Sequence, residues 1–354
     1  MAEWRWIRIF AEQFERCGLV PGEVVAVLAE SSSRPELVET ARLAAQLLEG
    51  QVFDLVVPTP VNDQPVAIRS TGASRALQGN PSVLAALSSA GLVLDCTVEG
   101  LLHAPELGAI LDGGARVLMI SNEYPENFER FRFDPALADR VGRAHAALDD
   151  AALMRVTSQA GTDLTVDLAG AVTAGSTGVT DGPASIAHWP GGLVLAFPAP
   201  GTVHGRVVLA PGDLNLTFKR YIEQPVTLRI EEDHVVDVGG DGVDADLFRS
   251  YLGAFAEAEG GRSAYACSHV GWGLNQQARW DYLELYDKGA VNGTEARAFA
   301  GGFLYSTGAN EVAGRFSAGH FDLPMRGCTI ALDGDVVVDG GRLVDRVDRH
   351  QGLS

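Results

Sequence analysis

The pattern of apolar residues changes near residue 150, and this change limits the possible folds more than any other feature of the sequence. Before it, short apolar runs alternate with segments of helical spacing; the runs are Glu23–Ala29, Val52–Val57, Leu92–Cys96 and Arg116–Ile120. Such alternation is typical of a mostly parallel sheet with helices on its faces. We therefore expect residues 1–150 to form an α/β domain.

Helical spacing fills the segments between these runs. The N-terminal residues place apolar side chains on one helix face, and Ser33 is the expected N-cap of a second helix. Pro81–Ala90 and Asp134–Asp149 have the same spacing. These helices would cover the two faces of the expected sheet.

After residue 150 the expected strands come in adjacent pairs. The three pairs are Leu153–Ser158 with Asp163–Leu168, Val226–Ile230 with Val235–Val238, and Cys328–Leu332 with Asp335–Val338. Asp333-Gly334 joins the last pair and is a strong hairpin signal. Only Val243–Glu257 and Gln276–Tyr286 have helical spacing in this half. We expect residues 151–354 to form a strand-rich α+β domain with antiparallel pairs.

Composition and charge narrow the possible partners. The chain has 27 basic and 46 acidic residues, a formal net charge of −19, which repels nucleic acid and anionic lipid. Four cysteines occur without a CxxC pair, which suits a reducing cytoplasm. We expect a cytoplasmic protein with no nucleic acid or membrane partner. Trp4, Trp6 and Ile9 could leave an apolar surface for a second copy, so we also expect a homo-oligomer.

His269, His320 and Asp322 are the residues that most suggest a metal site. If the segment around His320 is a strand, His320 and Asp322 share one face because side chains alternate. His269 lies in a second apolar run broken by glycines, which let backbone or substrate approach closely. Two imidazoles and one carboxylate can hold iron(II) on one face and leave sites open for substrate and O2. The same residues could hold zinc, or His320 could be a hydrogen-bonded core histidine.

The sequence also resembles a known family. The runs SHVGWGLN and GHFDLPM, together with GTDLTVDL and HWPGGLVLAFPAPGTVHG, resemble the 2,5-dihydroxypyridine 5,6-dioxygenases. Those enzymes are distant relatives of the aminopeptidase T type of metallopeptidase. The resemblance implies that His269, His320 and Asp322 bind Fe(2+), and that the ring opens between C5 and C6 to give N-formylmaleamate.

The sequence departs from the peptidases in a way that bears on the metal. Where the peptidases carry a Glu, this chain has Leu193 after its Pro-Gly-Gly turn and His269 before its Gly-x-Gly run. The loss of these carboxylates removes the ligands that bridge two metals. A single metal with two His and one Asp remains, which favours an oxygenase over a peptidase.

The same resemblance assigns residues around the metal. It makes His103, in a Leu102-His103 pair, the acid–base residue for the substrate, with Leu102 and Ser306 in the binding pocket. His188, in the run AHWPGG, is a further pocket candidate. His103 follows an expected strand, Leu92–Cys96, and open α/β sheets place ligands beyond the carboxyl ends of their strands. Each of these residues also has a purely structural explanation. His103 could cap a helix, Ser306 could belong to a turn, and His188 could be an ordinary loop residue.

Two other function classes also fit the sequence. A metal-dependent hydrolase or aminopeptidase would need a metal-activated water and usually two ions. A binding protein could keep the fold without the chemistry. The favoured interpretation is a mononuclear non-haem iron(II) dioxygenase of pyridine degradation, whose partners are a small aromatic substrate and O2.

Overall fold

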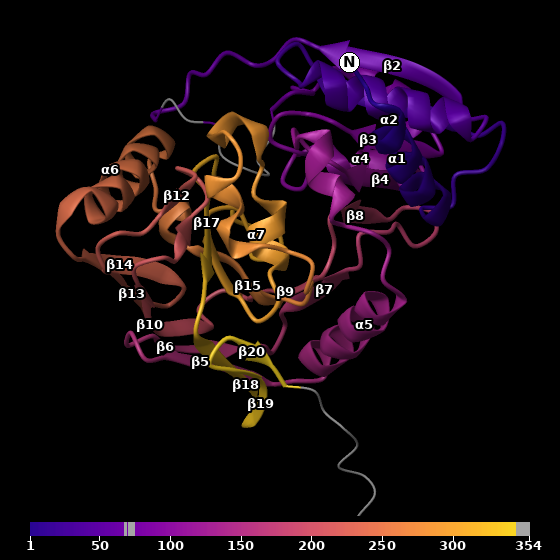
Figure 1. Cartoon of the computed structure of the whole chain (residues 1–354). Coiled ribbons are helices and arrows are strands. Elements are labelled where there is room, and N and C mark those ends of the chain that lie inside the picture. Colours follow the sequence, from indigo (N-terminus) through magenta and orange to yellow (C-terminus); the bar gives the residue numbers. More distant parts are fainter. Residues whose placement is uncertain (67–68, 70–74, 345–354) are drawn as a thin grey trace, which may run out of the picture.

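Two differently built halves make up the molecule (Figure 1). The computed structural model describes residues 1–66, 69 and 75–344. The first half contains a parallel sheet with the strand order β2-β1-β3-β4-β8. Its strands are β1 (Val24–Glu30), β2 (Gln51–Val57), β3 (Leu92–Asp95), β4 (Arg116–Met119) and β8 (Ile186–His188).

Helices cover both faces of this sheet, so its central strands are buried on both sides. One core layer joins Val25 and Val27 to α1 (Trp4–Arg16) and α2 (Pro35–Leu47). Another joins Ala26 and Leu28 to the opposite helices, which are α3 (Pro81–Ser88) and α4 (Leu107–Asp112). Alternate side chains of a single strand therefore enter different cores, because successive side chains of a strand point to opposite faces of the sheet.

The second half is built from antiparallel sheets. An eight-stranded sheet has the order β14-β13-β10-β6-β5-β18-β19-β20, and a five-stranded sheet has the order β17-β16-β15-β9-β7. The strands of the larger sheet are β5 (Leu153–Ser158), β6 (Asp163–Asp167), β10 (Val203–Leu209), β13 (Val226–Glu231), β14 (His234–Gly239), β18 (Cys328–Leu332), β19 (Asp335–Asp339) and β20 (Arg342–Leu343). Those of the smaller sheet are β7 (Val172–Ser176), β9 (Leu193–Phe197), β15 (Cys267–Gly273), β16 (Phe303–Thr307) and β17 (Phe321–Met325). A short pair, β11 (Leu214–Asn215) and β12 (Arg220–Tyr221), lies beside them.

Three α-helices and four 3₁₀ turns complete the described chain. They are α5 (Pro135–Asp149), α6 (Gly242–Glu259), α7 (Thr294–Ala298), η1 (Pro125–Glu129), η2 (Ser263–Tyr265), η3 (Trp280–Glu284) and η4 (Lys288–Ala290). The fold class predicted from the sequence, a parallel α/β half followed by an antiparallel strand-rich half, is confirmed.

Several details differ from the sequence-based expectation. Ser33 does not cap α2, because Arg34 occupies the N-cap position and the Ser33 hydroxyl instead donates to the carbonyl of Cys96, 2.7 Å away. Gln276–Tyr286 forms only the short turn η3 rather than a helix. Its apolar side chains pack in a small cluster with Leu214 and Val291, and a single helical turn is enough to place them there.

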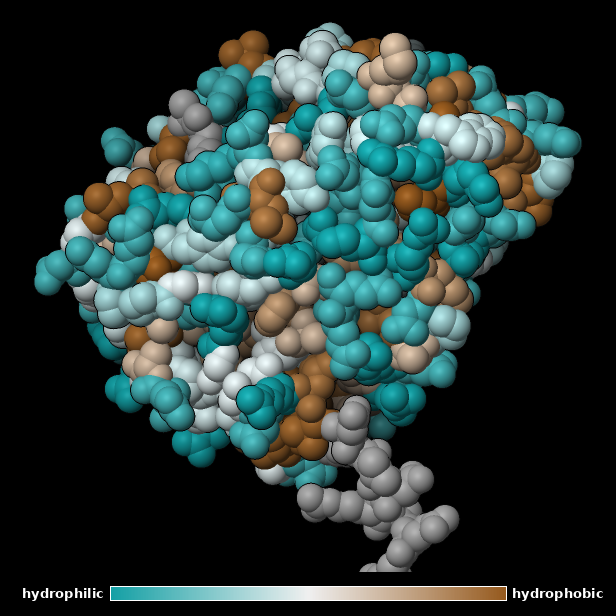
Figure 2. All heavy atoms as spheres, in the orientation of Figure 1, coloured by the Kyte–Doolittle hydropathy of each residue, from teal (hydrophilic) through white to brown (hydrophobic). Residues whose placement is uncertain are grey.

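The N-terminal apolar residues also differ from expectation. Trp6 and Ile9 are buried within the chain, and the Trp6 indole donates to Glu129 at 2.6 Å. Only Trp4 is exposed. The apolar surface predicted from these three residues is therefore wrong for two of them, and Figure 2 shows a mainly hydrophilic face with scattered hydrophobic residues.

The parallel sheet takes its last strand from beyond residue 150. Strand β8 pairs in parallel with β4, with Met119 opposite His188. This brings a histidine from later in the chain to the edge where β3 and β4 end. The division into residues 1–150 and 151–354 stays a prediction. No helix among the described residues combines the length and the apolar character that crossing a membrane requires.

Candidate metal centre

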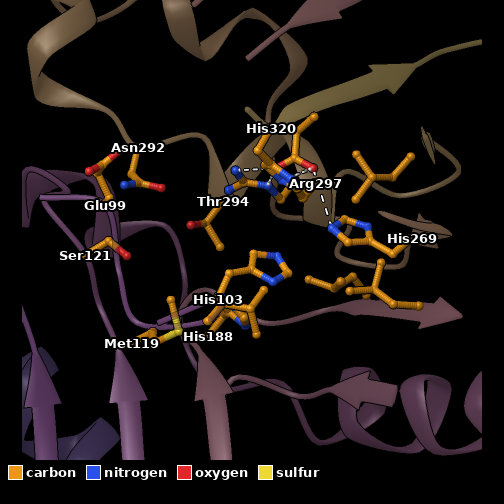
Figure 3. Close-up of a pocket in the computed structure, with 15 residues that line it drawn as sticks. Glu99, His103, Met119, Ser121, His188, His269, Asn292, Thr294, Arg297 and His320 are labelled. Carbon is orange, nitrogen blue, oxygen red and sulfur yellow. Dashed lines mark hydrogen bonds and ion pairs between the residues drawn. The ribbon is translucent and has the colours of Figure 1, made fainter. Parts of the chain in front are cut away.

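A pocket lies where the carboxyl ends of the parallel strands meet the five-stranded antiparallel sheet (Figure 3). The space between its atoms is about 480 Å³ when the open solvent at its mouth is included. Aliphatic side chains of Leu193, Leu195 and Leu304 form one wall. The position agrees with the rule that open α/β sheets bind ligands beyond the ends of their strands.

His269 enters this pocket from an irregular part of β15. The register of β15 against β16 shifts between Cys267 and Val270, so His269 lies in a bulge, a device that redirects side chains near active sites. Two residues later, a Cβ on Gly271 would lie 1.9 Å from the carbonyl oxygen of Val194 in β9. Glycine is therefore required for β9 and β15 to pair at this point, and this pairing fixes the strand that carries His269.

His320 and Asp322 reach the pocket from the start of β17. Asp322 pairs with Ser306 of β16, and His320 precedes the strand by one residue. Asp322 Oδ1 lies 3.2 Å from His320 Nε2 and 3.7 Å from His269 Nε2. All three side chains are almost fully buried. The three residues singled out in the sequence thus converge on one point.

Two further residues hold the Asp322 carboxylate. Oδ2 accepts from Arg297 of α7 at 2.6 Å, and Oδ1 accepts from the hydroxyl of Ser306. Burial alone would raise the pKa of Asp322, but the Arg297 guanidinium and the two imidazoles hold that pKa well below its usual range. The carboxylate is therefore charged, and Oδ1 is turned toward the histidines.

His103 lies next to these groups. Its ring stacks on that of His269, with centroids 6.2 Å apart and planes 9° apart. Single donor atoms of His103, His269 and His320 lie within 4.8 Å of one another. Nδ1 of His103 is 3.3 Å from Oε1 of Glu311. Two overlapping donor sets therefore exist, one with three imidazoles and one with two imidazoles and Asp322.

The other expected pocket residues divide into two groups. Leu102 and His188 line the pocket, and burial lowers the pKa of His188 to about 4, so this imidazole is neutral at neutral pH. Ser306 does not line it; its hydroxyl is bound to Asp322 instead. Its contact in the structure is with the carboxylate, not with the cavity.

Sequence analysis missed several polar residues of the site, among them Arg297, Glu311 and Glu99. Arg297 comes from a five-residue helix with no strong pattern, Glu311 from a loop, and Glu99 from the turn after β3. The position of Glu99, four residues before His103 and beyond a strand end, was the one available signal. Arg297 and Glu311 could not be found in this way, because their role depends on which strands are neighbours.

The donor atoms suit a single transition metal. Atoms that share one ion with bonds of about 2.1 Å lie roughly 3 to 3.5 Å apart, and the two Asp322 to histidine distances are 3.2 and 3.7 Å. Burial lowers the pKa of His269 well below its usual range, so this ring is neutral, as a ligand must be. Nδ1 of His269 and Nε2 of His103 are buried and make no hydrogen bond to any described residue.

Comparison with known proteins agrees with this geometry. The chain matches the NicX family, described as 2,5-dihydroxypyridine 5,6-dioxygenase, over residues 5–345. A Pseudomonas putida 2,5-dihydroxypyridine 5,6-dioxygenase is 36% identical over 326 residues, which cover 90% of both chains.

Solved structures give the same result. The structure of the 2,5-dihydroxypyridine dioxygenase from Pseudomonas putida KT2440 has a TM-score of 0.88 and 33% identity, covering 96% of this chain and 97% of that chain. AmpT from Thermus thermophilus has a TM-score of 0.60 at 15% identity, covering 96% and 99%, a likeness of fold alone. On the family match and the 36% identity, this chain belongs to the NicX family of 2,5-dihydroxypyridine 5,6-dioxygenases.

Proposed function

We propose that the protein is a mononuclear iron(II) dioxygenase that opens the ring of 2,5-dihydroxypyridine. One observation carries the proposal: Asp322 Oδ1 lies within 3.7 Å of Nε2 of both His269 and His320, inside a pocket that also holds His103. A set of two imidazoles and one carboxylate leaves coordination sites free, as oxygenase chemistry with O2 needs. Membership of a dioxygenase family supports the same conclusion.

His269, His320 and Asp322 would hold the iron, and His103 would handle the proton. If Nδ1 of His103 donates to Glu311, the second nitrogen, Nε2, carries a lone pair. Nε2 makes no hydrogen bond within the described chain, so it is available to accept the proton of a ring hydroxyl. Leu102 and the aliphatic wall exclude water from the apolar faces of the ring, and neutral His188 can donate or accept one hydrogen bond there.

The overall reaction needs no further co-reactant. Both atoms of O2 are added to the ring carbons C5 and C6, the bond between them breaks, and N-formylmaleamate contains every atom of both substrates. The iron supplies the redox chemistry that brings O2 and the electron-rich ring to react. The protein residues bind the ring, keep water out and accept the hydroxyl proton at His103.

Oxygen consumption tests the proposal directly. The protein reconstituted with ferrous iron under reducing conditions should consume one O2 for each 2,5-dihydroxypyridine, and ¹⁸O2 should place two labelled atoms in the product. His320→Ala should lose iron binding and ring cleavage together. Peptide cleavage with about two zinc or cobalt ions per chain, without O2 uptake, would favour a hydrolase instead.

We also propose that the protein is cytoplasmic and self-associates. The free cysteines Cys17, Cys96, Cys267 and Cys328 are consistent with a reducing compartment. Light scattering measures the oligomeric state; a monomer at micromolar concentration would contradict self-association.

A further inference from the structure

The end of the pocket away from His269 carries an unassigned carboxyl group, that of Glu99. Glu99 lies in the turn after β3, and Figure 3 places it beside Asn292, with His103 between this end and His269. Asn292 is held there because its side chain donates to the carbonyl of Val98 and its backbone N–H donates to Glu123. The pocket thus has one end with the expected metal ligands, near the histidines, and a separate polar end at Glu99.

The Glu99 carboxyl is mostly buried and has few partners. Its side chain is 14% exposed, and its nearest described cation is Arg69, at 3.9 Å. Within residues 1–66, 69 and 75–344, no group donates a hydrogen bond to it. Burial raises the pKa of Glu99 to about 8, against the opposing effect of Arg69 and with a further increase from Glu30. The raised pKa of Glu99 favours the carboxylic acid at neutral pH, and this form has one O–H donor and one C=O acceptor.

A ligand that matches such a group must offer an acceptor beside a donor. A 2-hydroxypyridine in its lactam form has this pair on one edge, the ring N–H and the neighbouring C=O. We propose that Glu99 is a specificity-determining residue that binds the lactam edge of the substrate through two hydrogen bonds. This inference rests on the proposed function for the identity of the ring.

The layout of the pocket then sets the orientation of the ring. In 2,5-dihydroxypyridine the 5-hydroxyl is para to the C2 oxygen. With the lactam edge at Glu99, the 5-hydroxyl points toward His103 and the metal ligands at the opposite end. One carboxyl group thereby selects a nitrogen heterocycle over a benzenediol and presents C5, with its hydroxyl, to the metal ligands.

Binding of an unreactive lactam tests this without turnover. We would measure 2-pyridone and N-methyl-2-pyridone by calorimetry at neutral pH with the iron-loaded protein, Glu99→Gln and Glu99→Leu. Glutamine keeps one donor and one acceptor, so it should bind 2-pyridone within about threefold of the wild type. Leucine should weaken binding roughly 10- to 100-fold, because a buried donor and acceptor of the ligand lose their partners. N-methyl-2-pyridone, which lacks the N–H, should bind weakly to all three.

A carboxylate outside the pocket is the matched control. Glu23 is 14% exposed like Glu99, but it pairs with Arg116 at 2.9 Å and does not line the pocket. Glu23→Gln should therefore leave 2-pyridone affinity unchanged. An equal loss of 2-pyridone affinity in Glu99→Gln and Glu99→Leu would overturn the proposal. It would mean that binding depends only on the Glu99 charge opposite Arg69 and not on two hydrogen bonds. Equal binding of the two pyridones by the wild type would also overturn it.

Turnover separates this inference from the proposed function. With 2,5-dihydroxypyridine, Glu99→Leu should raise KM by a similar factor and change kcat less, while Glu99→Gln restores KM. If the wild type binds 2-pyridone through Glu99 but consumes no O2, the proposed reaction fails and the lactam site stands. If the wild type turns over and Glu99→Leu has an unchanged KM, the lactam site fails and the reaction stands.

Discussion

The Asp322 carboxylate is shared between the expected metal and the protein. Oδ1 faces the two histidines, while Oδ2 accepts two guanidinium N–H groups of Arg297. Arg297 thus fixes the rotation of the carboxylate about its side-chain bond. Outer partners of this kind tune both the orientation and the affinity of a metal site.

Replacing Arg297 should therefore weaken iron binding. Arg297→Lys removes the two-point contact and should lower ferrous iron affinity by about 10- to 100-fold, measured by anaerobic titration. Arg315→Lys is the control, because Arg315 is equally buried, 13% exposed like Arg297, and pairs with Asp233 outside the pocket. Equal iron affinity in both variants would contradict the role of Arg297.

His103 decides which donor set binds the metal. If the ligands are His269, His320 and Asp322, His103→Ala should keep stoichiometric iron and reduce kcat by about 10²- to 10⁴-fold, the usual effect of losing an acid–base group. Metal analysis and O2 uptake on the same sample provide the measurement. Loss of iron in this variant would instead support the three-imidazole set.

Glu99 should also give the protein a pH-dependent stability. The pKa of Glu99 rises from 4.5 to about 8 on folding because the group is buried. Between these values the folded chain keeps a proton that the unfolded chain has released, so its contribution to stability is lost as pH rises. Glu99→Gln has no such proton. Its unfolding free energy relative to the wild type should increase from pH 5 to pH 9, on the order of 1–3 kcal/mol, in urea titrations. A difference that does not vary with pH would contradict the raised pKa.

At the scale of elements, the hairpin pairs and the alternation of the first half follow from local pattern. The three predicted hairpins form β5 with β6, β13 with β14, and β18 with β19. Asp333 and Gly334 have φ of 49° and 90°, which the predicted tight turn requires. The short helix α7 was missed because five residues are too few for a helical period to show.

Strand β15 gives a test at this scale. Gly271→Ala would place a Cβ 1.9 Å from a backbone oxygen of β9, so the two strands must separate. We expect a loss of about 3 kcal/mol or more in unfolding free energy, with weaker iron binding because His269 is two residues away. Gly142→Ala, in α5 with nothing within 4 Å, should be neutral or stabilising by about 0.5–1 kcal/mol. Similar effects of both changes in denaturant unfolding would contradict the close approach of the strands.

At the scale of the whole molecule, the two halves share structure. Strand β8 completes the parallel sheet although it follows β5, β6 and β7 in the chain. The pocket draws His103 and Glu99 from one half and His269 and His320 from the other. We therefore expect each half to stabilise the other, so that neither unfolds alone.

A single unfolding transition is the expected consequence. Far-ultraviolet circular dichroism and tryptophan fluorescence should give coincident denaturant curves, because neither half is complete without residues of the other. Two separate transitions would instead support independent domains divided near residue 150.

Local sequence was enough to predict the alternating strands and helices of the first half, the three hairpins and the shared face of His320 and Asp322, because these depend on residues close together in the chain. Three contacts become visible only in the folded chain: the meeting of His269 with Asp322, the salt bridge from Arg297, and the position of Glu99 opposite the histidines. Such contacts depend on the order of strands in a sheet and on where β8 inserts, and neither leaves a periodic signal in the sequence.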